Sequence, residues 1–283
     1  MTNPAPGLGG FPDLKPLKQT EFQRLRDLAY ERFGLDLREG KQDLVSARLG
    51  KKIRELGFSS FAEYIDFVTR DANGQALVEM IDLLTTNFTS FFREKAHFDF
   101  FSQILPRLAK EHGNIRIWSA ACSTGEEPYS IAMHGREHLT SAHLQIVATD
   151  ISTRALEKAK AGIYGDDRLR GIAPEILRKY FLRGEGKSSG LYRIKPMLRE
   201  GMEFRRLNLV DEYSHDRPFS VIWCRNVMIY FDKPTQELVV NKLASWLEPG
   251  GYLFIGHSEA LNGVRHPLRY VQPAIYQKGQ SGR

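Results

Sequence analysis

The sequence predicts an α/β chain: a small all-helical domain, then a parallel sheet covered by helices, with a small antiparallel subdomain inserted. Beyond about residue 110, short β-rich runs alternate with helical segments, which is typical of such a sheet. Before that residue, apolar side chains recur at helical spacing. The length of 283 residues allows one large domain or two smaller ones, and the change in pattern favours two.

The N-terminal residues divide into a tail and a helical domain. Prolines and glycines make up half of residues 1–12, which predicts a disordered tail. Residues 18–86 carry apolar side chains at helical spacing, and Ser60 with Glu63 matches the capping box at the start of a helix. We therefore expect a helical domain with its linker over residues 13–90.

The second domain is expected over residues 91–283. Its β-rich runs lie at 115–118, 144–148, 219–223 and 252–255, and helical segments lie between them near 126–139, 152–161 and 234–247. Glycines and a short β-rich run interrupt this alternation. They predict a small antiparallel β-subdomain over about residues 182–206.

Composition excludes several classes of protein. Hydrophobic residues make up 42% and charged residues 26%, an ordinary globular mixture that excludes disorder of the whole chain. No apolar run approaches the roughly 18 residues of a membrane span. The first residues lack the basic and apolar regions of a signal peptide, and two cysteines cannot build a disulfide framework. We expect a cytoplasmic protein.

The net charge of +6 is concentrated in short stretches. Residues 154–206 hold 14 basic against 7 acidic side chains, and residues 37–56 hold six against three. These stretches predict two basic surfaces that are candidates for docking an acidic partner. Each stretch is equally compatible with an ordinary solvated helix face.

Residues 117–129 combine a strand, a turn of small residues and a helix, the arrangement of a nucleotide-binding loop. Ala121, Ser123 and Gly125 fill its G-x-G-x-G positions, which is a poor match for binding pyrophosphate. Glu126 and Glu127 would repel a phosphate and suit a cationic ligand with hydroxyls, such as S-adenosylmethionine. The alternative is a close-packed turn with acidic residues at the helix start.

Polar residues follow other predicted strands. Asp150 ends the strand after the loop and is placed to accept hydrogen bonds from ribose hydroxyls, although it also suits the start of a helix. Arg225 and Asn226 follow a buried strand, with Tyr230 one turn later, and Asn208 follows another short strand. Ligands of open α/β sheets bind at this carboxyl edge.

Residues 85–94 alternate polar and aromatic side chains. Asn87, Thr89 and Arg93 are spaced so that their polar ends face one way while the phenylalanines pack. The alternative is a hydrophobic linker between two domains.

Taken together, these segments resemble the chemotaxis receptor methyltransferases (CheR), which are S-adenosylmethionine-dependent protein-glutamate O-methyltransferases. The resemblance covers about residues 18–278 and is carried by residues 86–94, 118–130, 148–152, 224–232 and 249–259. It implies a Rossmann-like methyltransferase sheet with the small subdomain inserted. It also implies methylation of specific chemoreceptor glutamates with S-adenosylmethionine, leaving S-adenosylhomocysteine and glutamate methyl esters.

The resemblance also implies roles for individual residues. Arg93 and Tyr230 would lie beside the sulfonium and the transferred methyl, and are the expected catalytic residues. No metal is implied. The implied cofactor-binding residues are Asn87, Thr89, Arg93, Glu126, Asp150, Asn208, Leu209, Arg225 and Asn226.

Two partner surfaces follow from the same resemblance. The basic helix around residues 41–56 would face the methylation region of the receptor, through Arg48, Lys51, Lys52 and Arg54. The β-subdomain would grip a C-terminal peptide tether of certain receptors, through Gly184, Gly186, Gly190 and Arg193. We expect a monomer that binds no nucleic acid and does not insert into the membrane.

Two other functions fit parts of the sequence. A methyltransferase for RNA or DNA would suit the basic stretch, but residues 184–206 offer only Tyr192 for stacking on a base. A non-catalytic receptor-binding relative would not need Arg93, Asp150 and Tyr230. A nicotinamide oxidoreductase is disfavoured by the missing glycines.

Overall fold

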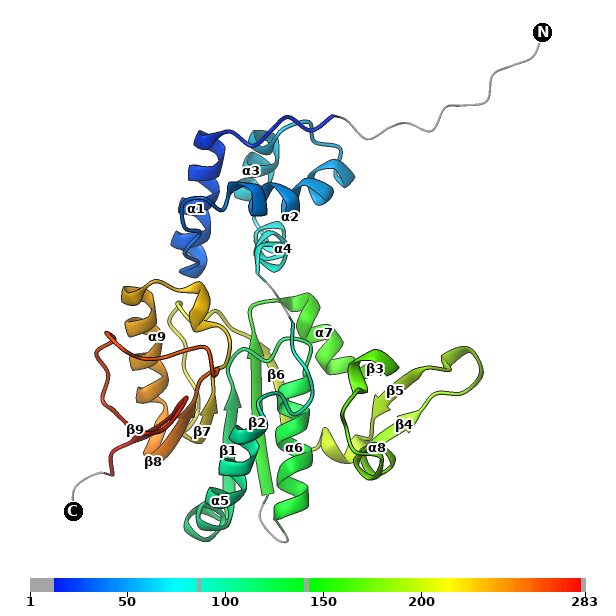
Figure 1. Cartoon of the computed structure of the whole chain (residues 1–283), viewed down its shortest axis with the longest axis vertical. Helices are drawn as coiled ribbons and strands as arrows, with labels where there is room; N and C mark the ends of the chain where they lie inside the picture. The colour runs from blue at the N-terminus through cyan, green and yellow to red at the C-terminus, as the bar shows by residue number, and fades with distance from the viewer. Residues whose placement is uncertain (1–12, 86–87, 140–142, 281–283) are drawn as a thin grey trace. The chain divides into compact units, whose positions relative to one another are not determined.

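The structure is a computed structural model that describes residues 13–85, 88–139 and 143–280. The predicted disordered tail, residues 1–12, lies outside these residues. The chain divides into two compact units, Met1–Thr86 and Asn87–Arg283 (Figure 1). This division falls a few residues before the expected boundary at residue 90. Among the described residues, none of the helices has the length and apolar character needed to cross a membrane.

The first unit is all-helical in its described part, as the spacing of apolar residues predicts. Its core is built from the apolar faces of the helices, for example Leu25, Val45, Ile65 and Ile81. The Ser60 hydroxyl accepts a hydrogen bond from the Glu63 amide (3.3 Å), so the predicted helix cap is confirmed. The helices are α1 (Gln19–Phe33), α2 (Gln42–Glu55), α3 (Phe61–Arg70) and α4 (Gln75–Leu84).

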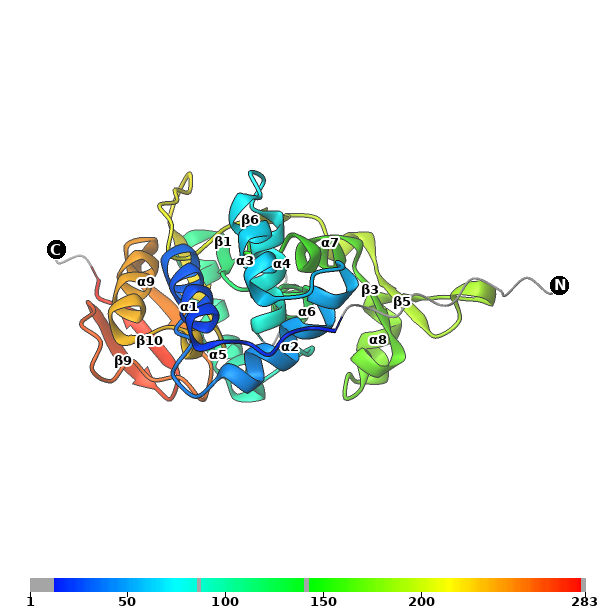
Figure 2. The same cartoon turned by 90° about the horizontal axis from the view of Figure 1, so that it is seen from above.

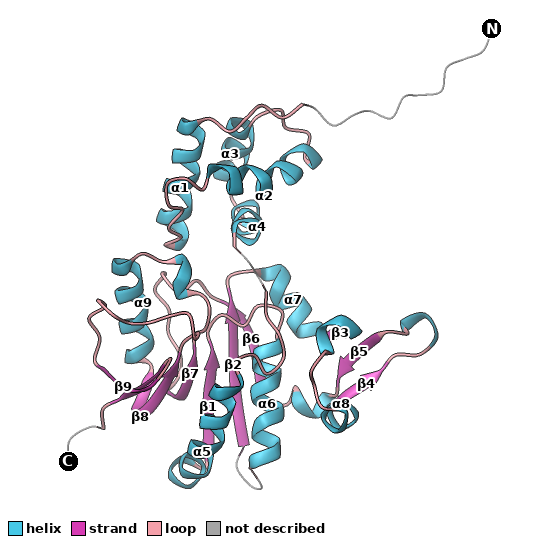
Figure 3. Cartoon of the chain, in the orientation of Figure 1, coloured by secondary structure: helices cyan, strands magenta, loops and turns pink. Residues whose placement is uncertain are grey.

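The main sheet of the second unit has seven strands among the described residues, in the order β6-β2-β1-β7-β8-β10-β9 (Figure 3). The strands from β6 to β8 pair in parallel, while β10 is antiparallel to both β8 and β9. The strands are β1 (Asn114–Ser119), β2 (His143–Asp150), β6 (Met202–Arg206), β7 (Phe219–Trp223), β8 (Leu247–Phe254), β9 (Leu268–Gln272) and β10 (Ile275–Lys278).

Helices cover both faces of this sheet. Ile117 and Trp118 are adjacent in β1 and belong to two different apolar clusters. Because neighbouring side chains of a strand point to opposite faces, these clusters are the two sides of the sheet. The cluster with Ile117 includes residues of α5 and α6, and the cluster with Trp118 includes residues of α9. The helices are α5 (Lys95–His112), α6 (Glu126–His138), α7 (Thr153–Ala161), α8 (Pro174–Tyr180) and α9 (Lys233–Ser245).

A second, three-stranded antiparallel sheet lies at the opposite side of the main sheet from β9 and β10 (Figure 2). Its strands are β3 (Ile163–Gly165), β4 (Phe181–Arg183) and β5 (Leu191–Ile194), in the order β3-β5-β4. The small subdomain is therefore present, but the predicted range 182–206 is wrong at both ends. The three residues of β3 are too few to show a period, and β6 pairs with β2 in the main sheet.

Gly125 lies where the loop after β1 meets the small sheet. Its φ is +97°, and a Cβ there would lie 2.9 Å from both the Ala159 Cβ and the Tyr164 hydroxyl. Tyr164 donates a hydrogen bond to the Thr124 carbonyl (2.8 Å), which holds the loop against β3. Glycine is thus required here by conformation and by packing.

Gly125→Ala should lower the free energy of unfolding of the second unit by roughly 2–4 kcal/mol, because positive φ and overpacking both oppose it. Gly171→Ala is the matched control, because Gly171 has a φ of +87° but its added Cβ would meet no described atom within 4 Å. Gly171→Ala should lower the free energy of unfolding by only about 1–2 kcal/mol. Urea unfolding followed by tryptophan fluorescence measures both, since Trp118, Trp223 and Trp246 all lie in the second unit. Equal losses would contradict the packing argument.

His215 is buried among aromatic rings. Its ring centroid lies 4.6 Å from that of Trp118, 4.8 Å from that of Phe219 and 5.0 Å from that of Trp246. Neither ring nitrogen has a hydrogen-bond partner among the described residues. Burial, together with the nearby charge of Arg116, lowers the pKa of His215 to about 4. The imidazole is therefore neutral in the folded unit.

This burial makes the second unit sensitive to acid. Below about pH 6.5 the unfolded chain takes up a proton at His215 that the folded unit cannot accept until about pH 4, so stability falls over this range. His215→Phe removes this contribution. Between pH 7.5 and pH 5, wild type should lose about 2 kcal/mol more than the variant in urea unfolding. His112→Gln, at an exposed histidine, should keep the wild-type pH dependence, and parallel curves for all three proteins would contradict the assignment.

Candidate functional site

The candidate site lies at the carboxyl edge of the parallel strands. Ser119 at the end of β1 is in register with Ala148 of β2 and Trp223 of β7, and Asp150 is in register with Arg206 of β6. The segments that follow these strands therefore emerge side by side. They carry most of the predicted site residues, and this edge is where open α/β sheets bind ligands.

Asp150 fixes the loop after β1 to the start of α7. Its carboxylate accepts hydrogen bonds from the Ser123 amide (2.7 Å) and the Ser152 amide (2.9 Å). Ser152, not Asp150, caps α7, because its hydroxyl accepts a hydrogen bond from the Ala155 amide (3.1 Å). A carboxylate is a hydrogen-bond acceptor, so this residue type at this position is chemically suited to a ligand that carries hydroxyls.

Glu126 is fully buried and is held by a residue that sequence reasoning missed. Its carboxylate accepts hydrogen bonds from the Thr124 hydroxyl (2.6 Å) and from Arg168, through Nε (3.1 Å) and Nη2. Arg168 Nη2 also donates to the Thr89 carbonyl (3.0 Å). Arg168 thereby brings together two predicted cofactor-binding residues, Glu126 and Thr89. No local pattern marks Arg168 in the sequence beyond its place in the basic stretch 154–206.

The side chain of Arg225 points into the protein. It is only 2% exposed and forms ion pairs with Glu94 (3.0 Å) and Glu127 (3.1 Å), while it also donates to the Arg93 carbonyl (2.6 Å). Burial raises the pKa of Glu127, and Arg225 opposes this rise. Burial also acts to raise the pKa of Glu94, but the positive charge and the hydrogen bond of Arg225 act against this rise, and that pKa stays below its usual value. Arg225 thus ties β7, α6 and the 93–94 segment together.

Arg93 and Tyr230 reach the same edge from different segments. Arg93 is half-buried, and its Nη1 donates to the Phe88 carbonyl (3.0 Å), which closes a turn in the 88–93 segment. Tyr230 ends the short 3-10 helix η4 (Met228–Tyr230) after β7 and is half-buried. The Arg93 carbonyl is held by Arg225, so both predicted catalytic residues depend on the end of β7.

Glu259 is a second residue that sequence reasoning did not single out, although it lies in a segment that carries the resemblance. It is buried and accepts hydrogen bonds from the amides of Asn226 (2.9 Å), Ile229 (3.3 Å) and Gly256. Asn226 has a φ of +60°, in the left-handed region that most residues other than glycine adopt only at an energetic cost. Glu259 therefore fixes the turn that carries Asn226 and Tyr230.

The remaining predicted cofactor-binding residues follow β6 or lie outside the described part. Asn208 donates from its side-chain amide to Asp211 (3.0 Å), and Leu209 is buried in the cluster with Trp118. Both lie at the same edge as Asp150, because β6 pairs with β2. Asn87 lies outside the described residues.

Among the described residues, Glu94, His97 and His257 have ligand atoms within 4.8 Å of one another, close enough to consider a metal ion. The Arg225 guanidinium lies 3.0 Å from the Glu94 carboxylate and would repel a cation there. Burial and Arg225 lower the pKa of His97 to about 3, and its ring packs edge-on against Trp223 and Phe254. The cluster is therefore better explained as packing around Arg225.

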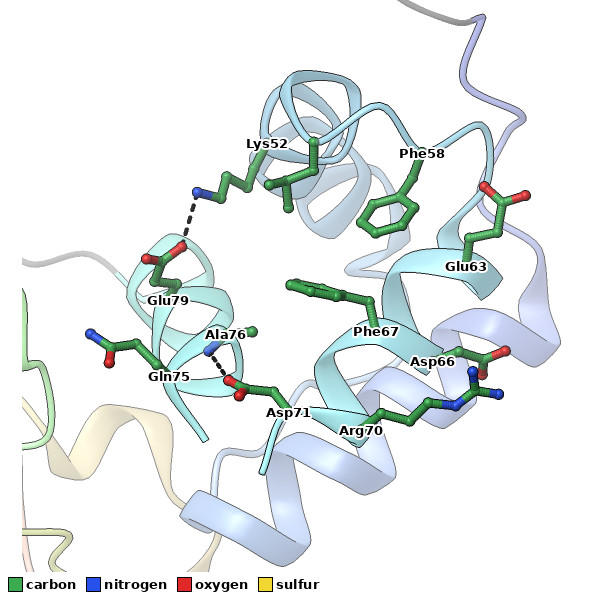
Figure 4. Close-up of a pocket in the computed structure, with 11 residues that line it drawn as sticks. Lys52, Phe58, Glu63, Asp66, Phe67, Arg70, Asp71, Gln75, Ala76 and Glu79 are labelled. Carbon is green, nitrogen blue, oxygen red and sulfur yellow. Dashed lines mark hydrogen bonds and ion pairs between the residues drawn. The ribbon is translucent and has the colours of Figure 1, made fainter. Parts of the chain in front are cut away.

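The predicted basic docking helix is α2, but three of its four cations have partners within the first unit. Arg48 donates to the Leu84 carbonyl, and Lys52 pairs with Glu79 (2.9 Å). Lys52, Glu79 and Phe67 are among the residues that line a hollow of about 760 Å³ (Figure 4). Lys51 pairs with Glu55 of the same helix (3.7 Å) but is exposed, as is Arg54.

The glycines predicted to grip a peptide shape the hairpin between β4 and β5. Gly186 and Gly190 have φ of +55° and +80°, and a Cβ on Gly184 would lie 2.1 Å from the Ser188 carbonyl oxygen. The hairpin thus needs these glycines for its own turn. Arg193 lies on β5 and is exposed.

Comparison with known proteins places this fold and site in one family. The family described as "CheR methyltransferase, all-alpha domain" matches residues 20–85, and "CheR methyltransferase, SAM binding domain" matches residues 87–276. The "Chemotaxis protein methyltransferase" of Borreliella burgdorferi is 40% identical over 273 residues, which cover 93% of this chain and 95% of that one. The protein of the same name from Salmonella typhimurium is 42% identical over 263 residues, which cover 92% and 90%.

These matches span both units and include the strand ends that form the site. The second unit is therefore an S-adenosylmethionine-binding methyltransferase domain, as predicted, and the first is the helical domain that accompanies it. The chain belongs to the CheR methyltransferase family.

Proposed function

We propose that this chain methylates glutamate side chains of chemoreceptors with S-adenosylmethionine and so forms glutamate methyl esters. The observation that carries the proposal is the match along both units to chemotaxis protein methyltransferases. The site supports it, because carboxylates at Asp150 and Glu126 suit the hydroxyls and positive charges of this cofactor. S-adenosylmethionine supplies, when bound, a methyl group activated by its sulfonium.

The protein's part in this reaction is mainly positioning. A glutamate side chain has an ordinary pKa of about 4.3, so it is ionised near neutral pH and needs no general base. The reaction is accelerated by holding the attacking carboxylate oxygen in line with the methyl carbon and the sulfur. Groups on rigid segments serve this purpose best, and Arg225 and Glu259 fix the segments that carry Arg93 and Tyr230.

Arg93 is the residue we assign to the substrate carboxylate. Its guanidinium can form charge-assisted hydrogen bonds that orient a carboxylate, and the Phe88 carbonyl restrains it. Tyr230 follows the turn held by Glu259, and we assign it to the position beside the methyl group. Neither role requires proton transfer, so the reaction needs a well-placed carboxylate rather than an acid–base pair.

Arg93→Ala should reduce turnover about a hundredfold or more, because the substrate carboxylate loses its orienting partner. The assay incubates the enzyme with labelled S-adenosylmethionine and receptor cytoplasmic fragments, and counts base-labile label on glutamate. Arg269→Ala is the matched control, since it removes an exposed guanidinium from β9, away from the carboxyl edge. Near-normal methylation together with normal cofactor affinity in Arg93→Ala would refute the assignment.

We also propose that the exposed cations of α2 dock the methylation region of the receptor, because such regions are rich in acidic residues. Lys51 and Arg54 are exposed and carry this role, whereas Arg48 and Lys52 hold α4. The β4–β5 hairpin, with exposed Arg193, would bind a C-terminal peptide of the receptor. The enzyme would act as a monomer in both contacts.

Lys51→Ala with Arg54→Ala should lower receptor methylation roughly threefold or more at low salt and flatten its salt dependence, because screened attraction is lost. Lys110→Ala with Arg269→Ala is the control, since it removes two exposed cations from the second unit. Methylation rates measured between low and high salt separate the outcomes. A double variant of α2 that keeps the wild-type salt curve would exclude this surface.

A further inference from the structure

The strand order fixes the direction in which a ligand lies along the carboxyl edge. From β6 through β2 to β1, the edge carries Asn208, Asp150 and then the loop that ends at Glu126. The proposed function puts the nucleoside of the cofactor at Asn208 and Asp150. Its amino-acid end then extends toward Glu126. That end carries an ammonium and a carboxylate side by side.

The structure already holds a pair of charges at this point. Glu126 is fully buried, and its carboxylate binds the guanidinium of Arg168 through Nε and Nη2. Arg168 comes from the 3-10 helix η1 (Asp166–Leu169), which follows β3 of the small sheet. The Arg168 side chain is 31% exposed whereas Glu126 is fully buried, so this ion pair reaches solvent through Arg168. Glu126 and Arg168 together are the electrostatic complement of an ammonium and a carboxylate.

Two other guanidinium groups at this edge have different partners. Arg225 is 2% exposed and is occupied by Glu94 and Glu127. Arg93 contacts the Phe88 carbonyl and lies near Glu94. Arg168 is the cation that contacts Glu126, and it also binds the Thr89 carbonyl (3.0 Å). It therefore stands where three segments of the site meet.

We propose that Arg168 is a cofactor-binding residue that receives the carboxylate of the amino-acid end, while Glu126 receives the ammonium. The inference rests on the proposed function. Binding exchanges one ion pair for two, so the buried Glu126 carboxylate has a cationic partner before and after. This matters because a buried charge without a partner is costly. The flexible, partly exposed Arg168 side chain is suited to such an exchange, whereas Arg225 is not.

The assignment also gives the inserted subdomain a part in cofactor binding. Arg168 and Tyr164 both belong to it, and they contact Glu126 and the Thr124 carbonyl of the loop. Arg168 lies within the stretch 154–206 that supplies the surplus of positive charge. One of those cations therefore serves the cofactor pocket rather than a docking surface.

The test compares two ligands that differ only in the carboxylate: S-adenosylhomocysteine and its decarboxylated analogue, which keeps the ammonium. Calorimetry gives the dissociation constant of each for the whole chain. In Arg168→Gln, affinity for S-adenosylhomocysteine should fall about tenfold or more, because a charge-assisted hydrogen bond is lost. Affinity for the decarboxylated analogue should not fall, since Glu126 still receives the ammonium and lacks its Arg168 partner in the free variant.

Arg168→Lys keeps the charge but loses the two-pronged geometry. It should weaken S-adenosylhomocysteine binding by roughly threefold and leave the analogue unchanged, which keeps the inference testable if Arg168→Gln folds poorly. Arg170→Gln is the matched control at an exposed arginine of the same segment, and both affinities should stay at wild-type values. Thermal unfolding of each variant reports whether the fold is intact.

The outcomes are distinct. An equal loss of affinity for both ligands in the Arg168 variants would mean that Arg168 only supports the loop, and would overturn the inference. An unchanged affinity for S-adenosylhomocysteine would overturn it as well. Failure of the wild-type chain to bind S-adenosylhomocysteine would instead refute the proposed function on which the inference rests.

Discussion

The buried guanidinium of Arg225 is the interaction on which the rest of the site depends. It joins the end of β7 to Glu127 at the start of α6 and to Glu94 beside Arg93. Both carboxylates are largely buried, and removing one member of such a network costs about 3–5 kcal/mol. The packing of His97 against Trp223 and Phe254 closes the same region from the apolar side. The segment that precedes α5 is thereby fixed to the sheet edge.

The site uses fixed charge pairs where phosphate-binding sites use glycine-rich backbone. Two neighbouring residues of α6 form ion pairs: Glu126 pairs with Arg168, and Glu127 pairs with Arg225. One pair is partly exposed and the other is sealed. This difference separates their roles, since the exposed pair can exchange partners with a charged ligand, while the sealed pair holds the frame. Gly125 is required by the contact with Tyr164 and Ala159, not by the approach of a phosphate.

The fold class and much of the site are accessible from the sequence because both follow from periodic patterns. Alternating strands and helices require a parallel sheet, and its carboxyl edge then collects Asp150 and the loop before Glu126. Arg168 and Glu259 were missed because their partners lie 42 and 33 residues away, and no local spacing marks such a contact. The same limit applies to Arg48. Helical periodicity predicts on which face of its helix Arg48 lies, but it does not predict that Arg48 binds the Leu84 carbonyl.

Charge counts along the chain limit where an acidic partner can bind, but contacts decide which cations are available. Within the stretch 154–206, Arg168, Lys179 and Arg205 are paired with Glu126, Glu137 and Glu203. Three other exposed cations of this stretch lie on one hairpin, namely Arg183 of β4, Lys187 of the turn and Arg193 of β5. The proposed peptide site on the hairpin therefore rests on three clustered cations. The surplus of seven charges counted in the sequence overstates the basic surface, because Arg168 and Lys179 pair with acids outside the stretch, and one of these acids, Glu126, is fully buried.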